Sequence, residues 1–335
     1  MKLLFELSKE HYTIPRSEVI SSLKAEDFIY DIISSNQDVI IVNTMNSYEK
    51  IKNLAKRLSY TFFIDELLFS CSPNLDIIKK YAKENPVFRT GSMAISCKNR
   101  STSINSQSII KILGEIYTKH KQVDLTNPDI EMRVFITDTN VYVGLKIAEV
   151  VRREFEKRKV QHRPFFSPIS LHPKLARALV NLSSIKQDET LLDPFCGTGG
   201  ILLEAGLIGA RVIGSDIEKK MIEGCQKTLD HYKIKNYQLI HSDVGEIHNY
   251  ISKVDAVVSD LPYGKSTTTK GENIKILYNR AFEEIAQVLK KNAIAVIGSP
   301  DKDIYIIGKK YFSILEKHEF RVHRSLTRFF ALFQG

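Results

Sequence analysis

Short apolar runs alternate with amphipathic segments through the C-terminal half of the chain. Apolar runs of about four to eight residues predict strands buried on both faces, and apolar positions three or four residues apart predict helices. The alternation therefore predicts a doubly wound α/β domain over residues 167–335, Rossmann-like and mostly parallel, with a terminal antiparallel hairpin. The expected strands are 190–194, 211–216, 237–243, 254–262, 293–300, 320–326 and 327–333.

Both periodicities also occur before residue 155, but in mixed order. Runs rich in β-branched and aromatic residues predict strands, and segments with helical spacing predict helices, in an α+β arrangement. We divide this part into an N-terminal ferredoxin-like segment, 1–72, and a second unit, 73–155. Residues 156–166 are dense in charge with little periodicity, which predicts a linker. The expected helices are 21–33, 47–60, 74–86 and 103–120, and a turn at Asp138-Thr139-Asn140 joins the last two strands.

Composition and charge narrow the class of protein. The net charge of +9, with its surplus in the middle and C-terminal parts of the chain, favours a polyanionic partner. The four cysteines stand singly, without a CxxC pair or histidines at metal-ligand spacing, so we expect no disulfide and no metal. No apolar run reaches the length of a membrane span, and the N-terminus lacks a signal-peptide pattern. These features predict a cytoplasmic protein without a membrane partner.

A glycine-rich turn follows the first strand of the α/β domain. Asp193-Pro194-Phe195-Cys196-Gly197-Thr198-Gly199-Gly200 joins that strand to a helix, where glycine lets the backbone approach a ligand closely. Asp216 ends the next strand, where a carboxylate can accept from ribose hydroxyls, and Asp243 ends the third. Each acid alone would suit a helix cap, but three at successive strand ends favour a nucleoside ligand. The expected ligand-binding residues are Asp193, Phe195, Gly197, Gly199, Asp216, Ile217, Asp243, Val244 and Ser167.

A second motif, Asp260-Leu261-Pro262-Tyr263-Gly264, ends the fourth strand. An exocyclic amine on a base is a poor nucleophile because its lone pair is delocalised into the ring. The Asp260 carboxylate and a backbone carbonyl, that of Leu261, can each accept one N–H and direct the lone pair towards a methyl donor. Tyr263 can stack on a base flipped out of its helix. The expected catalytic residues are Asp260, Leu261, Pro262 and Tyr263.

Together the two motifs resemble those of Rossmann-fold amino-methyltransferases. The glycine turn is similar to motif I, and Asp260-Leu-Pro-Tyr is similar to the D/N/S-P-P-Y/F motif, with Leu261 in place of proline. The segments 163–168 and 171–179 resemble the element that closes over the methionine end of the donor. Residues 123–136, followed by 141–145, resemble the end of a THUMP domain, an RNA-binding module of tRNA-modifying enzymes.

The chain resembles, over nearly its whole length, the archaeal tRNA guanine-10 N2-methyltransferases. The resemblance implies S-adenosylmethionine as the methyl donor, tRNA as the partner, and mono- and dimethylation of guanine 10. It also implies a THUMP domain at 73–155 that grips the acceptor end of the tRNA. A small activating protein is a further partner that the sequence leaves open.

Several residues remain after these motifs. Cys196 fits a space-filling role better than that of a nucleophile, and His172 fits a helix cap. Basic residues along the chain are candidates for contacts with phosphate, and Arg321 and Arg328 on the terminal hairpin are two of them. The expected RNA contacts are Arg89, Lys98, Arg100, Arg152, Arg153, Lys265, Lys270 and Arg324.

Three other functions remain open from the residues. The same catalytic motif serves methylation of adenine N6 in DNA or RNA, and it serves guanine N2 at another position in tRNA. A non-catalytic RNA-binding protein with a vestigial methyltransferase fold is the alternative of another class. The complete set of Asp193, Gly197, Gly199, Asp216 and Asp260 argues against this last alternative.

Overall fold

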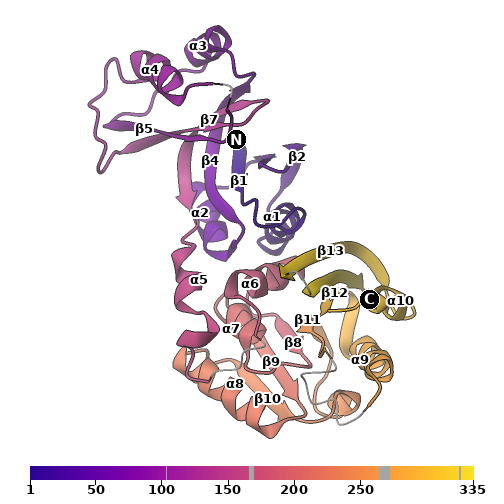
Figure 1. Cartoon of the computed structure of the whole chain (residues 1–335). Coiled ribbons are helices and arrows are strands. Elements are labelled where there is room, and N and C mark those ends of the chain that lie inside the picture. The colour runs from indigo at the N-terminus through magenta and orange to yellow at the C-terminus, as the bar shows by residue number, and fades with distance from the viewer. Residues whose placement is uncertain (103, 166–169, 264–271, 324–325) are drawn as a thin grey trace. The chain divides into compact units, whose positions relative to one another are not determined.

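The computed structural model describes the chain except for residues 103, 166–169, 264–271 and 324–325 (Figure 1). The described chain forms two compact units, each built from segments that are separate in the sequence. Unit 1 consists of Met1–Lys9, Phe28–Lys56 and Thr61–Val150. Unit 2 consists of Glu10–Asp27, Arg57–Tyr60 and Val151–Gly335. No helix in the described ranges combines the length and the apolar character that crossing a membrane requires.

Unit 1 is built on one mixed sheet of seven strands in the order β2-β3-β1-β4-β7-β6-β5. β4 pairs with both β1 and β7, so the segments 1–72 and 73–155 contribute to the same sheet. The turn expected at 138–140 does join two antiparallel strands, β6 and β7. The strands are β1 (Lys2–Leu7), β2 (Tyr30–Ser35), β3 (Val39–Thr44), β4 (Thr61–Cys71), β5 (Met93–Asn99), β6 (Ile130–Ile136) and β7 (Val141–Glu149).

Local sequence explains where the helices of unit 1 begin and end. α3 (Leu75–Glu84) is capped by Asn74, whose side chain accepts from the amides of Asp76 and Ile77, and it ends before Pro86. The other helices are α2 (Tyr48–Arg57) and α4 (Ser106–Tyr117).

The helix predicted at 21–33 is wrong in position. The structure has a helix, α1 (Ile14–Ala25), followed by the strand β2. Asp27 lies between them with a φ of 49°, a left-handed conformation that ends the helix. β2 is an edge strand with exposed side chains, so its sequence carries no alternation of buried and exposed residues that would have predicted a strand.

A buried arginine joins two acidic residues inside unit 1. Arg133 on β6 is 5% exposed, and its guanidinium donates to Glu6 at 2.5 Å and to Asp65 at 2.8 Å. The same guanidinium lies 3.4 Å from the centroid of the Phe63 ring. Burial raises the pKa of Asp65 to about 7. The ion pairs therefore connect β1, β4 and β6 through the interior of the sheet.

Unit 2 contains the predicted doubly wound domain, and its sheet has the order β10-β9-β8-β11-β12-β14-β13. The first five strands are parallel, and β12, β14 and β13 pair antiparallel, as expected. Its strands are β8 (Thr190–Asp193), β9 (Arg211–Asp216), β10 (Tyr237–His241), β11 (Val254–Asp260), β12 (Leu289–Ser299), β13 (Ser313–His323) and β14 (Leu326–Gln334).

Helices cover both faces of this sheet (Figure 1). Leu191 belongs to the core beneath α6 and α7, whereas the next residue, Leu192, belongs to the core beneath α9. Consecutive buried residues on opposite faces are what a continuous apolar strand predicts. The helices are α5 (Arg153–Lys157), η1 (Val160–His162), α6 (Pro173–Leu182), α7 (Gly200–Gly206), α8 (Lys219–His231), η2 (Val244–Asn249), α9 (Ile274–Val288) and α10 (Asp303–Gly308).

The N-terminal helix α1 belongs to unit 2, where a buried carboxylate fixes it. Glu18 accepts hydrogen bonds from the Ser59 amide and hydroxyl at 2.9 and 2.6 Å, and from the Tyr60 amide at 2.8 Å. The Asn181 side chain of α6 donates to the same carboxylate at 2.8 Å. Burial raises the pKa of Glu18, and these four donors offset part of that effect. Segments distant in the sequence thus complete the core around α6.

Candidate functional site

Three acidic side chains meet where parallel strands of unit 2 end. Asp193 ends β8, Asp216 ends β9 and Asp260 ends β11, and these strands are consecutive in the sheet order. The negative charges of Asp216 and Asp260 both raise the pKa of Asp193, so the three carboxylates lie near one another. The carboxyl edge of a doubly wound sheet is where such folds bind ligands.

The glycine turn has the geometry of a ligand cradle. Gly197 has a φ of 50°, and a Cβ built there would meet no described atom within 4 Å. Its amide donates to the Asp216 carboxylate at 3.0 Å. Gly199 has a φ of 79°, and a Cβ there would lie 2.6 Å from the Cys225 sulfur. Glycine is therefore required at 199 by packing and conformation, while at 197 the space beside the backbone is open.

Asp193 is buried and joins two strands of the site. Its carboxylate accepts from the Ser259 hydroxyl on β11 at 2.7 Å and from the Phe195 amide at 3.1 Å. Burial is the main cause that raises its pKa to about 7. The carboxylate thereby fixes the start of the glycine turn against the strand that carries Asp260.

The remaining residues of the predicted ligand site occupy different surroundings. Asp216 accepts from two amides, those of Gly197 and Glu218, which leaves lone pairs on both oxygens. Asp243 does not end a strand as expected: β10 stops at His241, and Asp243 caps η2 by accepting from the Gly245 amide and forms an ion pair with Arg280. The other three predicted residues are Ile217, which is half-buried, Val244, which lies in the core, and Ser167, which lies outside the described residues.

The Asp260 carboxylate has one engaged and one open oxygen. Its Oδ2 accepts from the Tyr263 hydroxyl at 2.7 Å and lies 3.7 Å from Nη2 of Arg328. Its Oδ1 is buried and has no hydrogen-bond partner among the described residues. Burial raises the pKa of Asp260, and the charge of Arg328 opposes that shift. An unpaired buried acceptor is costly, so this oxygen is suited to a donor from a ligand.

Among the described residues, the Leu261 carbonyl is a second acceptor that receives no hydrogen bond. The Leu261 amide donates to the Gly298 carbonyl at 2.8 Å, which continues the parallel ladder between β11 and β12. In that register, the next donor to the Leu261 carbonyl would be the amide of residue 300, which is proline and has no N–H. By contrast, the Pro262 carbonyl accepts from the Tyr278 hydroxyl at 2.8 Å. Proline at 300 thus leaves one carbonyl of the motif available.

Gly298 allows the Asp260 side chain to lie where it does. A Cβ at 298 would lie 2.8 Å from Asp260 Oδ1 and 2.5 Å from Cε1 of Phe330. Gly298→Ala is therefore expected to lower the free energy of unfolding by about 1–3 kcal/mol, measured by urea denaturation. The matched control is Gly114→Ala in the middle of α4, where a Cβ meets nothing within 4 Å. This control should be about 0.5–1 kcal/mol more stable, and an equally tolerated Gly298→Ala would contradict the packing argument.

Cys196 and His172 have the structural roles expected of them. A hydrogen bond to the Cys225 thiol and burial raise the pKa of the Cys196 thiol, so it is not an activated nucleophile. The His172 side chain accepts from the Lys174 amide at 3.2 Å and caps α6.

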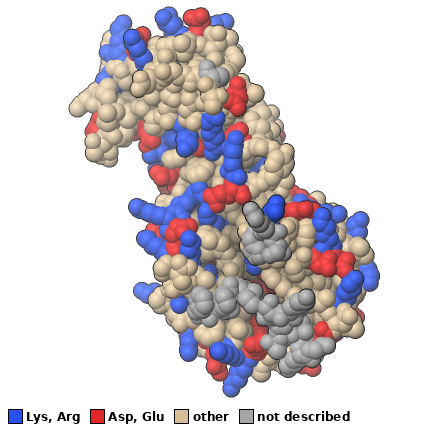
Figure 2. All heavy atoms as spheres, in the orientation of Figure 1, with Lys and Arg blue, Asp and Glu red and all other residues tan. Residues whose placement is uncertain are grey.

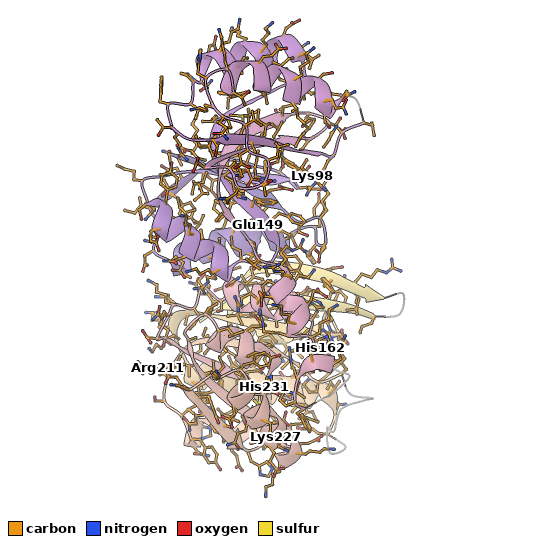
Figure 3. All side chains as sticks on the ribbon, turned by 90° about the vertical axis from the view of Figure 1, so that its left-hand side faces the viewer. Lys98, Glu149, His162, Arg211, Lys227 and His231 are labelled. Carbon is orange, nitrogen blue, oxygen red and sulfur yellow. The ribbon has the colours of Figure 1, made fainter. Side chains whose placement is uncertain are left out.

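Lysine and arginine side chains cover both units in Figure 2, interspersed with acidic side chains. Arg89 pairs with Glu66, and Arg152 pairs with Glu10, so both cations are already engaged. Lys98, labelled in Figure 3, and Arg153 are exposed. Three further predicted RNA contacts, Lys265, Lys270 and Arg324, lie outside the described residues.

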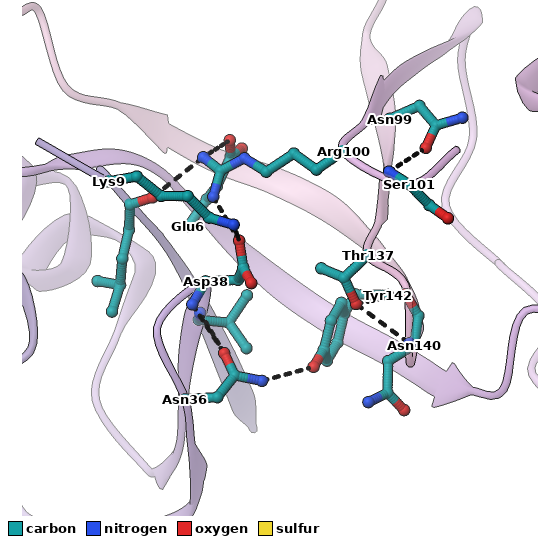
Figure 4. A network of polar contacts seen from close by, with 12 residues as sticks. Glu6, Lys9, Asn36, Asp38, Asn99, Arg100, Ser101, Thr137, Asn140 and Tyr142 are labelled. Carbon is teal, nitrogen blue, oxygen red and sulfur yellow. Dashed lines mark hydrogen bonds and ion pairs between the residues drawn. The ribbon is translucent and has the colours of Figure 1, made fainter. Parts of the chain in front are cut away.

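Arg100 belongs to a polar network of unit 1 (Figure 4). Its guanidinium pairs with Asp38 at 2.6 Å and with Glu6 at 3.5 Å, and it donates to the Leu7 carbonyl at 3.1 Å. Lys9 contacts the same Asp38 at 3.0 Å. These contacts favour a structural role for Arg100 over a contact with RNA.

The sequence did not identify three residues that shape the site. Arg328 is 7% exposed and contacts Asp260, whereas the sequence suggested a phosphate contact. Tyr278 fixes the Pro262 carbonyl, and Gly298 makes room for the carboxylate. All three lie outside the two motifs: the pairing of β11, β12 and β14 brings Gly298 and Arg328 to the site, and α9 brings Tyr278. Among the described residues, no cluster of three or more His, Cys, Asp or Glu could hold a metal ion.

Comparisons with known proteins agree with this geometry. The sequence model of a family described as "RMKL-like, methyltransferase domain" matches residues 160–329. A second model, described as "DNA methylase", matches residues 33–227 and ends before Asp260. The crystal structure of TrmN from Thermus thermophilus has the same fold, with a TM-score of 0.58, 17% identity and full coverage of both chains.

Two curated relatives align with most of the chain. The tRNA (guanine(10)-N2)-dimethyltransferase of Methanothermobacter thermautotrophicus is 34% identical over 338 residues, which cover 98% of each chain. The protein of the same name from Methanocaldococcus jannaschii is 33% identical, and the match covers 89% of this chain and 91% of the relative. With this identity over nearly the full length, the chain belongs to the tRNA (guanine(10)-N2)-dimethyltransferase family.

Proposed function

We propose that the protein transfers methyl groups from S-adenosylmethionine to the exocyclic N2 amine of guanine in tRNA. The observation that carries this proposal is that the Oδ1 of buried Asp260 and the carbonyl of the next residue, Leu261, both lack a hydrogen-bond donor among the described residues. Two acceptors can receive the two N–H groups of one amine and orient its lone pair. The names of the relatives support guanine 10 as the target and two successive methylations as the outcome.

The residues at the strand ends fit the methyl donor. The open space at Gly197 admits a ligand against the backbone, and the Asp216 carboxylate retains lone pairs for the ribose hydroxyls. We assign the adenine side to Asp243 and the adjoining residues Ile217 and Val244. When bound, S-adenosylmethionine supplies an electrophilic methyl group on its sulfonium.

The catalytic motif would act on the amine as follows. Asp260 Oδ1 and the Leu261 carbonyl accept its two hydrogens, which directs the nitrogen lone pair away from the ring plane. The Tyr263 hydroxyl remains on Oδ2, and its ring stacks on the flipped guanine. When the nitrogen takes the methyl group, the bond from that methyl to the donor sulfur would break and the nitrogen would release a proton, which the unpaired Oδ1 of Asp260 can accept. The same arrangement serves a second methylation because one N–H remains.

Nucleoside analysis tests the function directly. Unmodified tRNA is incubated with the purified full chain and S-adenosylmethionine, digested, and analysed by mass spectrometry with fragment mapping. We expect N2-methylguanosine first and N2,N2-dimethylguanosine later, both at position 10. Product at another guanine would correct the position, and absence of any methylated guanosine would overturn the proposal.

A second candidate is methylation of adenine N6, which the DNA methylase match favours. The same assay with double-stranded DNA and unmodified RNA distinguishes it, because N6-methyladenosine has its own mass transitions. Calorimetry with S-adenosylmethionine addresses the non-catalytic alternative, which requires that the donor not bind.

A further inference from the structure

The terminal hairpin brings a buried cation to the catalytic motif. Arg328 lies on β14, whose neighbour β12 pairs in turn with β11, the strand that ends in Asp260. Its Nη2 is 3.7 Å from Asp260 Oδ2, and its guanidinium carbon is 5.2 Å from the centroid of the Tyr263 ring. Gly298 lies between these strands, and a side chain there would collide with the carboxylate.

Four described titratable groups face the Asp260 carboxylate. Asp260 is faced by Asp193 from β8, by Tyr263 from its own loop, by Tyr278 from α9 and by Arg328 from β14. Asp193 is acidic, and the two tyrosines are neutral near neutral pH because burial raises their pKa values. Arg328 is thus the cation of this set, and its charge lowers the pKa of Asp260 against the effect of burial.

The Arg328 guanidinium and the Asp260 carboxylate each have one buried atom that forms no hydrogen bond with the described residues. Nε of Arg328 is buried without a hydrogen-bond partner among the described residues, and the same is true of Asp260 Oδ1. The 3.7 Å ion contact is longer than a hydrogen bond. Polar groups of active sites are often loosely paired before substrate binds, and they tighten in the complex.

We propose that Arg328 is a positioning residue of the methyl-transfer site, which keeps Asp260 ionised and holds the Tyr263 ring on its guanidinium face. Oδ1 then stays available to the substrate amine, and the opposite face of the Tyr263 ring receives the base. The proposal rests on the function proposed above. It predicts that loss of the charge at 328 acts on Asp260 and not on binding of the methyl donor.

The first test requires neither donor nor tRNA. In protein labelled with ¹³C at the aspartate carboxyls, the Asp260 signal is assigned by its absence in Asp260→Asn and followed through a pH titration. Arg328→Met should raise the titration midpoint of Asp260 by about 1–3 pH units, the usual effect of an adjacent cation. The matched control is Arg211→Met, an exposed arginine at the opposite end of β9 (Figure 3), which should leave the midpoint unchanged. An unchanged midpoint in Arg328→Met overturns the proposal even if the wild type methylates no tRNA.

The second test measures methyl transfer to tRNA against pH. Arg328→Met should lower kcat more at the acidic end of the pH range than at the alkaline end, because loss of the cation raises the pKa of Asp260. Arg328→Lys, which keeps the charge, should retain the wild-type pH profile, and calorimetry should give unchanged donor affinity in both variants. Arg328→Gln is measured alongside as a second neutral replacement, in case the methionine variant does not fold. An equal deficit at every pH would reduce Arg328 to a packing role and overturn the inference.

Discussion

Asp260→Ala is expected to reduce the rate of methyl transfer by a factor of about 10²–10⁴ and to leave binding of S-adenosylmethionine nearly unchanged. The substitution removes the open Oδ1, which we assign to the amine, and it removes the partner of the Tyr263 hydroxyl. The predicted donor contacts that the structure describes lie at the ends of β8 and β9 or in the segments after β8, β9 and β10, so they are not part of the altered strand. The measurement is single-turnover methylation of tRNA, with donor affinity by calorimetry.

The matched control is Asp255→Ala at the other end of the same strand. Asp255 accepts from the Thr190 amide and from Lys290, far from the carboxyl edge. Asp255→Ala removes a comparable acidic side chain from the same strand, but it should leave the rate of methyl transfer unchanged. Wild-type turnover by Asp260→Ala would show that the role assigned to this carboxylate is wrong.

Arg133→Met is expected to lower the free energy of unfolding of unit 1 by about 3–5 kcal/mol, because it leaves the buried Asp65 carboxylate without its cation and leaves Glu6 only the longer contact with Arg100. Glu6 and Asp65 are each 2% exposed, so water cannot replace the guanidinium. The measurement is urea denaturation followed by circular dichroism. The control is Lys146→Met on β7, which breaks a half-exposed ion pair with Glu131 and should cost less than about 1 kcal/mol.

The sign of the pH dependence follows from Asp65. Its pKa is raised from 3.8 to about 7, so the folded protein binds more protons than the unfolded chain between these values. This contribution to stability is present at low pH and is lost as the pH rises through 7. Without Arg133 the effect should grow, so Arg133→Met should lose less stability at pH 5 than at pH 8. Equal losses at both values would argue against an uncompensated carboxylate as the cause.

Periodicity predicted most of the fold because most strands are buried. The central strands of unit 2, β8 and β11, are covered on both faces, so their sequences are mostly apolar runs. The error at 21–33 arose where this pattern is absent, since β2 is an exposed edge strand. Nor does periodicity indicate that α1 packs on α6, because it does not show which helices share a core or that Asn181 donates to Glu18.

Site residues within a motif could be predicted, whereas those supplied by sheet pairing could not. Asp193, Asp216 and Asp260 follow strands of one parallel sheet, so their meeting at one edge is implied by the order of elements. Arg328 reaches the same edge through an antiparallel hairpin, and its partner is 68 positions away in the sequence. The position of the Asp260 carboxylate that it contacts depends on a glycine at 298, which carries no signature of its own.

Unit 2 is built from segments that lie far apart in the sequence, and this has a consequence during synthesis on the ribosome. α1 leaves the exit tunnel early, yet the helix that covers Ile14, α6, is translated roughly 150 residues later. At about 5–20 residues per second, the nascent chain holds that apolar surface without its native cover for on the order of ten seconds. We therefore expect the apolar face of α1 to be shielded during this interval, by a chaperone or by transient local collapse.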